Sequence, residues 1–326
     1  MDVLIIGGTQ FVGRALTDAA LAAGHEVTLF HRGQTGADIF PDVPRVLGDR
    51  DGEIERLDGR WDVVIDTCGY VPRLVSSSVD HLSRRAERYV FVSTISVYAD
   101  DVVPPVVEAS KLAAAEGDLG EVIDGRTYGP LKAQCERVVR DRCPDALIIR
   151  PGLIVGPWDP TDRFSYWPDR VRRGGRVLAP GAPERPIQII DVRDLAEWTI
   201  AAIGAQCRGT YNLVGPESPL SMRVFLDACR EVSGAEAEFA WIDDDALVAG
   251  DAKPMTEVPF WLPGSHPRSA WVFRIDAARA RGAGLRYRTI EETIGATLAW
   301  LDTRAPDRVW KAGLSAEREA VLLQRD

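Results

Sequence analysis

A glycine-rich turn (residues 6–13, IGGTQFVG) lies between the first predicted strand and the first predicted helix of the chain. In this position, backbone N–H groups and the helix N-terminus face a pyrophosphate. Gly7 allows the sharp turn and Gly13 lets the helix pack closely on the sheet, while Gln10 stands where a middle glycine is often found. The alternative, a tight turn without a ligand, is disfavoured because the turn follows the very first strand.

The N-terminal half alternates short apolar runs with amphipathic segments. These patterns predict strands at 3–6, 26–30, 44–47, 63–67, 89–93 and 147–150, and helices at 11–23, 71–85 and from Tyr128 onward. Apolar runs bounded by turns and separated by helical patterns indicate a parallel sheet with helices on both faces. We therefore expect a doubly wound α/β domain of the Rossmann type over residues 1–150.

The pattern changes after residue 150. Proline and glycine cluster at 151–157 and 179–183, and seven of the nine tryptophans lie between Trp158 and Trp300. A chain of 326 residues is also long for a single small core. We expect residues 151–326 to form mainly a smaller substrate-binding lobe, with a strand and helix at about 187–205 returning to the Rossmann sheet.

Composition narrows the classes of partner. The formal net charge of -10 disfavours electrostatic binding to nucleic acid or anionic lipid. Neither a basic, apolar leader nor a run of 18 apolar residues is present, so we expect no signal peptide and no transmembrane helix. The five cysteines form no Cys-x-x-Cys pair, which predicts neither a zinc site nor a disulfide framework. These features favour a cytoplasmic protein without a metal.

The end of the second strand bears on the choice of dinucleotide. NAD-binding units usually place an acid there for the ribose 2′-hydroxyl, but this chain has His31 and Arg32. A guanidinium suits a 2′-phosphate, so NADP(H) is favoured and NAD(H) remains possible. The alternative for Arg32 is a solvated surface residue. Asp49 and Arg50 follow the third strand, where they either border the adenine ring or belong to a polar loop.

Tyr128 and Lys132 have i, i+4 spacing, which puts them on one face of a helix. A nearby ammonium favours tyrosinate and predicts a lowered pKa for Tyr128, which would then serve as an acid/base. Pro130 falls within the first helical turn if Thr127 is the N-cap, and there its missing N–H costs nothing. Tyr-x-x-x-Lys alone is a weak signal, and its value depends on the strand before it.

The strand at 89–93 is followed by hydroxyl residues, in the order Ser93, Thr94, Ile95 and Ser96. In a doubly wound sheet, ligands bind beyond the carboxyl ends of the strands. We therefore expect Thr94 to lie over a nicotinamide and to bond a substrate oxygen. The alternative is that Thr94, Ser93 or Ser96 merely caps the end of the strand.

Together these residues resemble the extended short-chain dehydrogenases/reductases, also called the NAD-dependent epimerase/dehydratase family. Matching stretches are residues 93–98 (STISVY), Tyr128 with Lys132, residues 150–157 (RPGLIVGP) and residues 188–196 (QIIDVRDLA). Two departures stand out. Gln10 interrupts the glycine turn, as in the atypical branch, and residues 66–69 (DTCG) replace a His-x-Ala-Ala stretch that lies beside the cofactor in the family.

The resemblance implies a catalytic set of Thr94, rather than Ser93, with Tyr128 and Lys132. The implied cofactor site comprises Gly7, Thr9, Gln10, Phe11, Val12, Gly13, His31, Arg32, Asp49, Arg50, Thr67, Cys68, Gly69, Ser93, Tyr128, Lys132 and Pro151. Candidate substrate contacts are Ser96, Tyr98, Trp158, Arg163, Tyr166, Arg185 and Trp261. For the aromatic members, ordinary core packing of the smaller lobe is the alternative.

Three functions remain open. The leading hypothesis is an NAD(P)-dependent oxidoreductase that moves hydride at a carbonyl or alcohol carbon of a small molecule, with Tyr128 as acid/base. The second is an epimerase or dehydratase that retains NAD and acts on a sugar-nucleotide-like substrate. The third is a cofactor-sensing or RNA-binding protein without turnover. The resemblance also implies a possible homodimer through helices near 71–85 and 128–140.

Overall fold

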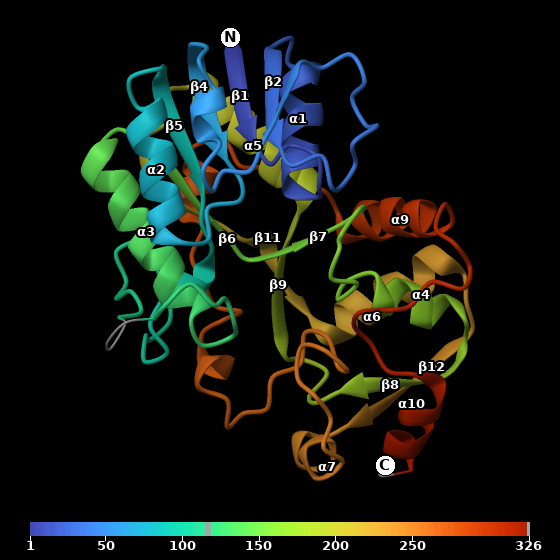
Figure 1. Ribbon diagram of the computed structural model, residues 1–326. Helices are drawn as coiled ribbons and strands as arrows, with labels where there is room; N and C mark the ends of the chain where they lie inside the picture. Colours follow the sequence, from blue (N-terminus) through green and yellow to red (C-terminus); the bar gives the residue numbers. More distant parts are fainter. Residues whose placement is uncertain (115–118, 325–326) are drawn as a thin grey trace.

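The computed structural model describes residues 1–114 and 119–324 (Figure 1). Its largest element is a seven-stranded sheet in the order β10-β6-β5-β4-β1-β2-β3, in which every neighbouring pair is parallel. The strands are β1 (Asp2–Ile6), β2 (Glu26–His31), β3 (Arg45–Leu47), β4 (Trp61–Asp66), β5 (Ala86–Val92), β6 (Leu147–Pro151) and β10 (Gly209–Leu213). The predicted doubly wound α/β sheet is confirmed.

Helices cover both faces of this sheet (Figure 1). On one face α1 (Val12–Ala22) packs with α5 (Val192–Gly204), and on the other α2 (Pro72–Leu82) packs with α3 (Tyr128–Arg142). Val3 and Ile5 belong to the core on the α1 side, whereas Leu4 and Ile6 belong to the core on the α2 side. Because both faces of β1 are buried, this strand needs consecutive apolar residues, and that run of apolar residues is the pattern that predicted it.

The strand order reverses at β1. From β1 the chain builds outward through β2 and β3, and then returns to place β4, β5 and β6 on the opposite side. A ligand crevice opens at such a switch point, beyond the carboxyl ends of the strands. This places a candidate site at the ends of β1, β4 and β5.

The smaller lobe has its own sheets and core. It contains a three-stranded sheet, β11-β9-β7, and a parallel pair, β12-β8. Its strands and helices are β7 (Leu153–Val155), β8 (Gly175–Pro180), β9 (Pro186–Asp191), β11 (Gly215–Ser221), β12 (Ala237–Ile242), α4 (Tyr166–Arg172), α6 (Met222–Ser233), α7 (Asp244–Ala249), α9 (Ile290–Leu301) and α10 (Ala316–Leu323). Short α8 (Ala278–Gly282) contacts β10, and 3-10 turns span Ile54–Arg56, Ile95–Val97 and Pro267–Ala270.

The segment at 187–205 differs from its prediction. Its strand forms as β9, but it pairs with β7 and β11 rather than joining the main sheet. Its helix, α5, does return to the Rossmann layer beside α1. The strand that joins the main sheet is β10, whose sequence GTYNL is too short and too polar to stand out. A boundary between domains near residue 150 stays a prediction.

Over the residues described, no helix is both long and apolar enough to cross a membrane.

Candidate active site

A cavity of about 300 Å³ opens beyond the carboxyl ends of β1 and β2. Many of the predicted cofactor residues lie on its wall: Gly7, Thr9, Gln10, His31, Arg32, Asp49, Arg50 and Cys68. The wall also includes residues that the sequence did not single out, among them Phe30, Gln34, Thr35, Tyr70 and Leu74. The structure thus gathers segments from four separate loops around one crevice.

The glycine turn has the geometry that its pattern predicts. Gly7 has a φ of +102°, and a Cβ there would lie 2.4 Å from the hydroxyl oxygen of Thr67. A Cβ on Gly13 would lie 2.9 Å from the carbonyl oxygen of Gly7. Helix α1 follows with Phe11 at its N-cap and Val12 as its first residue, and no side chain of the described chain caps it. The N–H groups of Gly13 and Arg14 donate to the Gln10 carbonyl, at 2.9 and 3.4 Å, so an anion at this end of the helix is favoured mainly by the helix dipole.

The end of β2 carries two groups suited to a polar ligand. His31 is buried, its Nδ1 accepts a hydrogen bond of 3.0 Å from the Gly33 N–H, and its Nε2 has no partner among the described residues. Burial, and next the Arg45 charge, lower the pKa of His31, so the ring is neutral and Nε2 carries the proton. Arg32 lies exposed on the same wall. The unpartnered Nε2–H of His31 is suited to a sugar hydroxyl, and the Arg32 guanidinium is suited to a phosphate, as a dinucleotide would supply.

The Arg50 guanidinium is bonded to buried residues of β4 and α2, although Arg50 also borders the cavity. It is 8% exposed, and its guanidinium donates two hydrogen bonds of 2.9 Å to the carboxylate of Asp66 and one of 2.8 Å to Ser78. Tyr89 also donates to Asp66, at 3.0 Å. Burial raises the pKa of Asp66, but the charge and hydrogen bonds of Arg50, with smaller contributions from Lys132 and the Cys68 N–H, together hold it below its usual range. This buried pair fixes the floor of the crevice, whereas Asp49 remains half-buried at the wall.

Thr94 and Tyr128 meet at the end of β5. Tyr128 is the first residue of α3, and its hydroxyl is hydrogen-bonded to the Thr94 side chain. Thr94 also accepts a hydrogen bond of 3.1 Å from the Ser96 N–H, so one hydroxyl is both the strand-end cap and the partner of the tyrosine. Thr127 is the N-cap of α3, as expected, although its own hydroxyl bonds Val122 and Asp124 instead of the helix.

The electrostatics of Tyr128 differ from the prediction. Burial raises its pKa, and the Thr94 hydrogen bond and the Arg163 charge offset only part of that rise. The predicted lowering of the Tyr128 pKa by the Lys132 charge was wrong, because the Lys132 ammonium bonds backbone carbonyls and its charge is not among the causes that act on the tyrosine. Lys132 is 1% exposed and donates hydrogen bonds of 2.7 Å to the carbonyls of Gly69 and Val92. Burial lowers the pKa of Lys132 to about 8.

Ser93 faces the interior. Its hydroxyl donates a 2.6 Å hydrogen bond to Glu136, which also accepts two hydrogen bonds, of 2.9 and 2.7 Å, from Arg150. Glu136 and Arg150 are both almost completely buried, as is Pro151 beside them. Glu136 and Arg150 come from a helix and a separate strand, and no spacing rule along the sequence identifies such a pair.

The candidate substrate residues separate into two groups. Arg163 is half-buried and near enough to Tyr128 to act on its hydroxyl, and Ser96 lies beside Thr94. The others serve packing or other contacts. Tyr98 and Trp261 are buried in the core, Tyr166 packs on Trp167 within the smaller lobe, Arg185 is paired with Asp244, and Trp158 stacks beneath Arg14. Core packing therefore accounts for most of the predicted aromatic lining.

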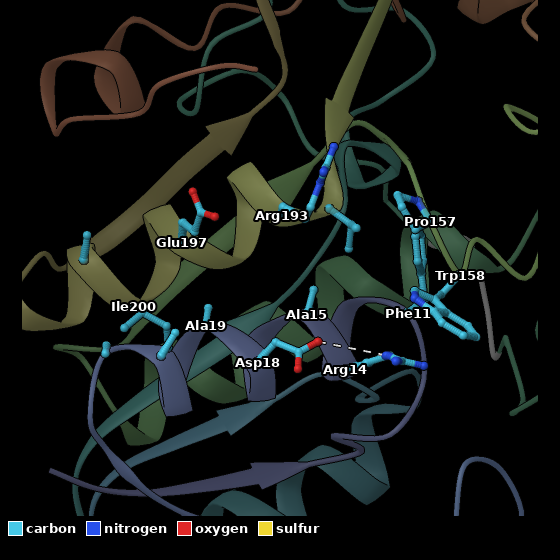
Figure 2. Close-up of a pocket in the computed structure, with 14 residues that line it drawn as sticks. Phe11, Arg14, Ala15, Asp18, Ala19, Pro157, Trp158, Arg193, Glu197 and Ile200 are labelled. Atoms are coloured by element: carbon cyan, nitrogen blue, oxygen red, sulfur yellow. Dashed lines mark ion pairs between the residues drawn. The ribbon is translucent and has the colours of Figure 1, made fainter. Parts of the chain in front are cut away.

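A larger cavity, of about 720 Å³, lies between α1 and α5 (Figure 2). Figure 2 shows Phe11, Arg14 and Trp158 at one end of it, and Ala19 and Ile200 toward the other. Its lining includes neither Tyr128 nor Thr94 nor the glycines of the turn. Tyr128 and Thr94 do not line the smaller cavity either, but the glycine turn does. Tyr70 on its wall has its ring centroid 6.4 Å from that of Tyr128, so we place the candidate active site at the smaller cavity.

Comparison with known proteins supports the fold. No family model matches the chain. A solved structure of an enzyme named WbmH from Bordetella bronchiseptica, in complex with NAD+, is 18% identical with a TM-score of 0.69, covering 93% of this chain and 98% of that one. A UDP-N-acetylglucosamine 4-epimerase from Methanobrevibacter ruminantium is 15% identical with a TM-score of 0.70, covering 93% and 99%.

These two solved structures share the fold of this chain, which is the fold that the resemblance to the extended short-chain dehydrogenases/reductases implied. The resemblance read from the motifs is thus confirmed for the architecture. Among curated proteins, the chloroplast stem-loop binding protein of 41 kDa b from Arabidopsis thaliana is 26% identical over 254 residues. That alignment covers 71% of this chain and 63% of the relative, so the chain spans less than two thirds of this relative's length.

Proposed function

We propose that this chain is an NAD(P)-dependent oxidoreductase of the short-chain dehydrogenase/reductase type, acting at a carbonyl or alcohol carbon of a small molecule. The observation that carries the proposal is the Thr94–Tyr128 hydrogen bond beside a cavity lined by the glycine turn. The neutral His31 and the exposed Arg32 at that cavity fit a dinucleotide. When bound, a nicotinamide supplies a hydride donor or acceptor.

The chain's own residues move the proton. Tyr128 is protonated at neutral pH, as an ordinary tyrosine is and the more so because burial raises its pKa, and in the reductive direction it donates a proton to a substrate oxygen. Thr94 donates a hydrogen bond toward the same oxygen atoms, and Arg163 supplies positive charge as Tyr128 becomes anionic. Lys132 bonds the carbonyl of Gly69, in the loop after β4, and that of Val92, at the end of β5, and so holds these two segments together.

The proposal is tested in two steps. Purified protein is titrated calorimetrically with NADPH and with NADH, and then supplied with a panel of aldehydes, ketones and secondary alcohols while absorbance at the nicotinamide band is followed. We expect saturable dinucleotide binding and turnover of at least one class of substrate. Absence of binding to either dinucleotide would remove the basis of the proposal.

An epimerase or dehydratase is the second candidate. It is favoured by the solved structures with this fold, which include sugar-nucleotide epimerases and complexes with NAD. Such an enzyme oxidises and then reduces the same substrate, so it keeps its dinucleotide. Tightly bound nicotinamide released by denaturing the freshly purified protein, without net turnover in the alcohol and ketone panel, would favour this function over the first.

The name of the Arabidopsis relative raises the third hypothesis, binding to RNA stem-loops. The formal charge of -10 counts against electrostatic attraction to RNA. The Thr94–Tyr128 bond counts in favour of turnover. We therefore keep the enzyme as the proposal. A homodimer likewise stays a prediction, which sedimentation at micromolar concentration tests.

We predict that Arg32→Ala weakens NADPH binding more than NADH binding. Arg32 is the exposed cation on the wall where β2 ends, and a guanidinium bonded to a 2′-phosphate contributes about 1.5–3 kcal/mol, or roughly ten- to a hundredfold in Kd. Calorimetric dissociation constants for both dinucleotides measure the effect. Arg60→Ala, a change of an exposed arginine outside the cavity lining, is the control. Equal losses for both dinucleotides would contradict a role at the 2′ position.

We predict that Arg163→Leu moves the Tyr128-dependent limb of the pH–rate profile to higher pH. The Arg163 charge lowers the tyrosine pKa, so its removal leaves the opposing effect of burial less compensated. In the reductive direction, Tyr128 would then remain protonated, and activity persist, to a higher pH. Arg163→Lys keeps the charge and is the matched control. A limb that moves to lower pH would contradict the assignment.

A further inference from the structure

Tyr70 joins the two halves of the candidate site. It lines the cavity with Cys68 and Leu74, and its ring centroid lies 6.4 Å from that of Tyr128. The residue is 42% exposed, an unusual degree for an aromatic side chain flanked by buried catalytic groups. The predicted cofactor residues that follow β4 are Thr67, Cys68 and Gly69, and Tyr70 is the next residue along the chain.

The backbone beside Tyr70 is held on two sides. Lys132 donates a 2.7 Å hydrogen bond to the carbonyl of Gly69, and its Nζ lies 5.4 Å from the Tyr70 ring centroid. A Cβ on Gly69 would come within 2.6 Å of the Phe91 ring, so the chain passes close against β5 at this point. The ring is therefore presented to the crevice from a fixed backbone. Burial raises the pKa of Tyr70, which keeps its hydroxyl neutral.

We propose that Tyr70 binds the nicotinamide half of the dinucleotide, so that it selects for an intact dinucleotide over its adenosine fragment. This inference rests on the proposed function. A ligand that extends from the cavity at the end of β2 to the hydroxyl of Tyr128 must pass the ring that borders both. An aromatic face packs well against planar heterocycles and against the apolar face of a ribose. Lys132, which bonds the carbonyl of Gly69, supports the position of Tyr70 through the backbone.

The test compares whole and half ligands. Wild type, Tyr70→Ala and Tyr70→Phe are titrated calorimetrically with NADPH and NADH, and with 2′,5′-ADP and AMP as adenosine-half probes. We expect Tyr70→Ala to raise the Kd of the dinucleotides by about tenfold and to leave the Kd of the two fragments within about twofold of wild type. Tyr70→Phe keeps the ring and should bind all four ligands as wild type does.

Trp310→Ala is the control, because Trp310 is a partly buried aromatic packed on the core of the smaller lobe. It should leave all four dissociation constants unchanged. If Tyr70→Ala weakens the fragments as much as the dinucleotides, Tyr70 contacts the adenosine half and the inference is wrong. If wild type binds the dinucleotides and Tyr70→Ala binds them equally well, the inference fails while the proposed function stands. If wild type binds none of them, the proposed function itself fails.

Discussion

Replacing Tyr128 with phenylalanine should lower kcat by on the order of a hundredfold or more while leaving dinucleotide binding in place. The substitution keeps the ring that packs against Tyr70 and removes only the hydroxyl bonded to Thr94. Because the lost group moves the proton and does not line the cavity at the end of β2, the Kd of NADPH or NADH should stay near that of wild type. Steady-state kinetics with the best substrate, paired with calorimetry, measure both quantities.

Tyr287→Phe is the matched control for this experiment. Its hydroxyl donates a 2.8 Å hydrogen bond to the carbonyl of Val214, in a part of the fold that the mechanism does not use. We expect kcat to be unchanged there. Near-normal turnover by Tyr128→Phe would show that another group moves the proton. If Tyr128→Phe loses both dinucleotide binding and turnover, the substitution disturbs the site as a whole.

The fold could be predicted from sequence because its main signals are local. Val3 to Ile6 need apolar side chains on both faces of a covered sheet, and Gly7 and Gly13 are required by the positive φ and the close backbone approach of the turn itself. The Tyr128 helix was placed by spacing and by a proline that its first turn tolerates. Each of these features is encoded within about a dozen residues, which is the range that periodicity resolves.

The partners of the buried charged side chains could not be predicted from such local patterns. Lys132 shares a helix face with Tyr128, yet its ammonium bonds carbonyls at the ends of two other strands. Arg50 borders the cavity, yet its guanidinium is paired with Asp66, a residue on a separate strand. In each case the partner is set by tertiary packing, which brings together residues with no fixed spacing. The same holds for Arg163, which acts on Tyr128 from beyond the sheet.

The largest effect on stability should come from Glu136→Gln. Glu136 is completely buried and accepts hydrogen bonds from Arg150, Arg140 and Ser93. The amide leaves the buried Arg150 guanidinium without a counter-charge, which typically costs about 3–5 kcal/mol in the free energy of unfolding. Urea denaturation measures this as a lower midpoint at an unchanged slope. Arg142→Ala removes an exposed ion pair with Asp80 from the same helix and should cost no more than about 1 kcal/mol.

Two further measurements separate the charge from general disturbance of the core. The double variant Glu136→Leu with Arg150→Met removes both charges and should recover much of the stability that Glu136→Gln loses. The second is pH dependence. Burial raises the pKa of Glu136, but the Arg150 hydrogen bonds and charge outweigh it and hold the pKa below its usual range. The stabilisation is therefore full above the unfolded-state pKa and is lost as pH falls through the folded-state value. Wild type should lose stability on acidification more steeply than Glu136→Gln, and parallel curves for the two proteins would show that the carboxylate charge is not what holds Arg150 in the core.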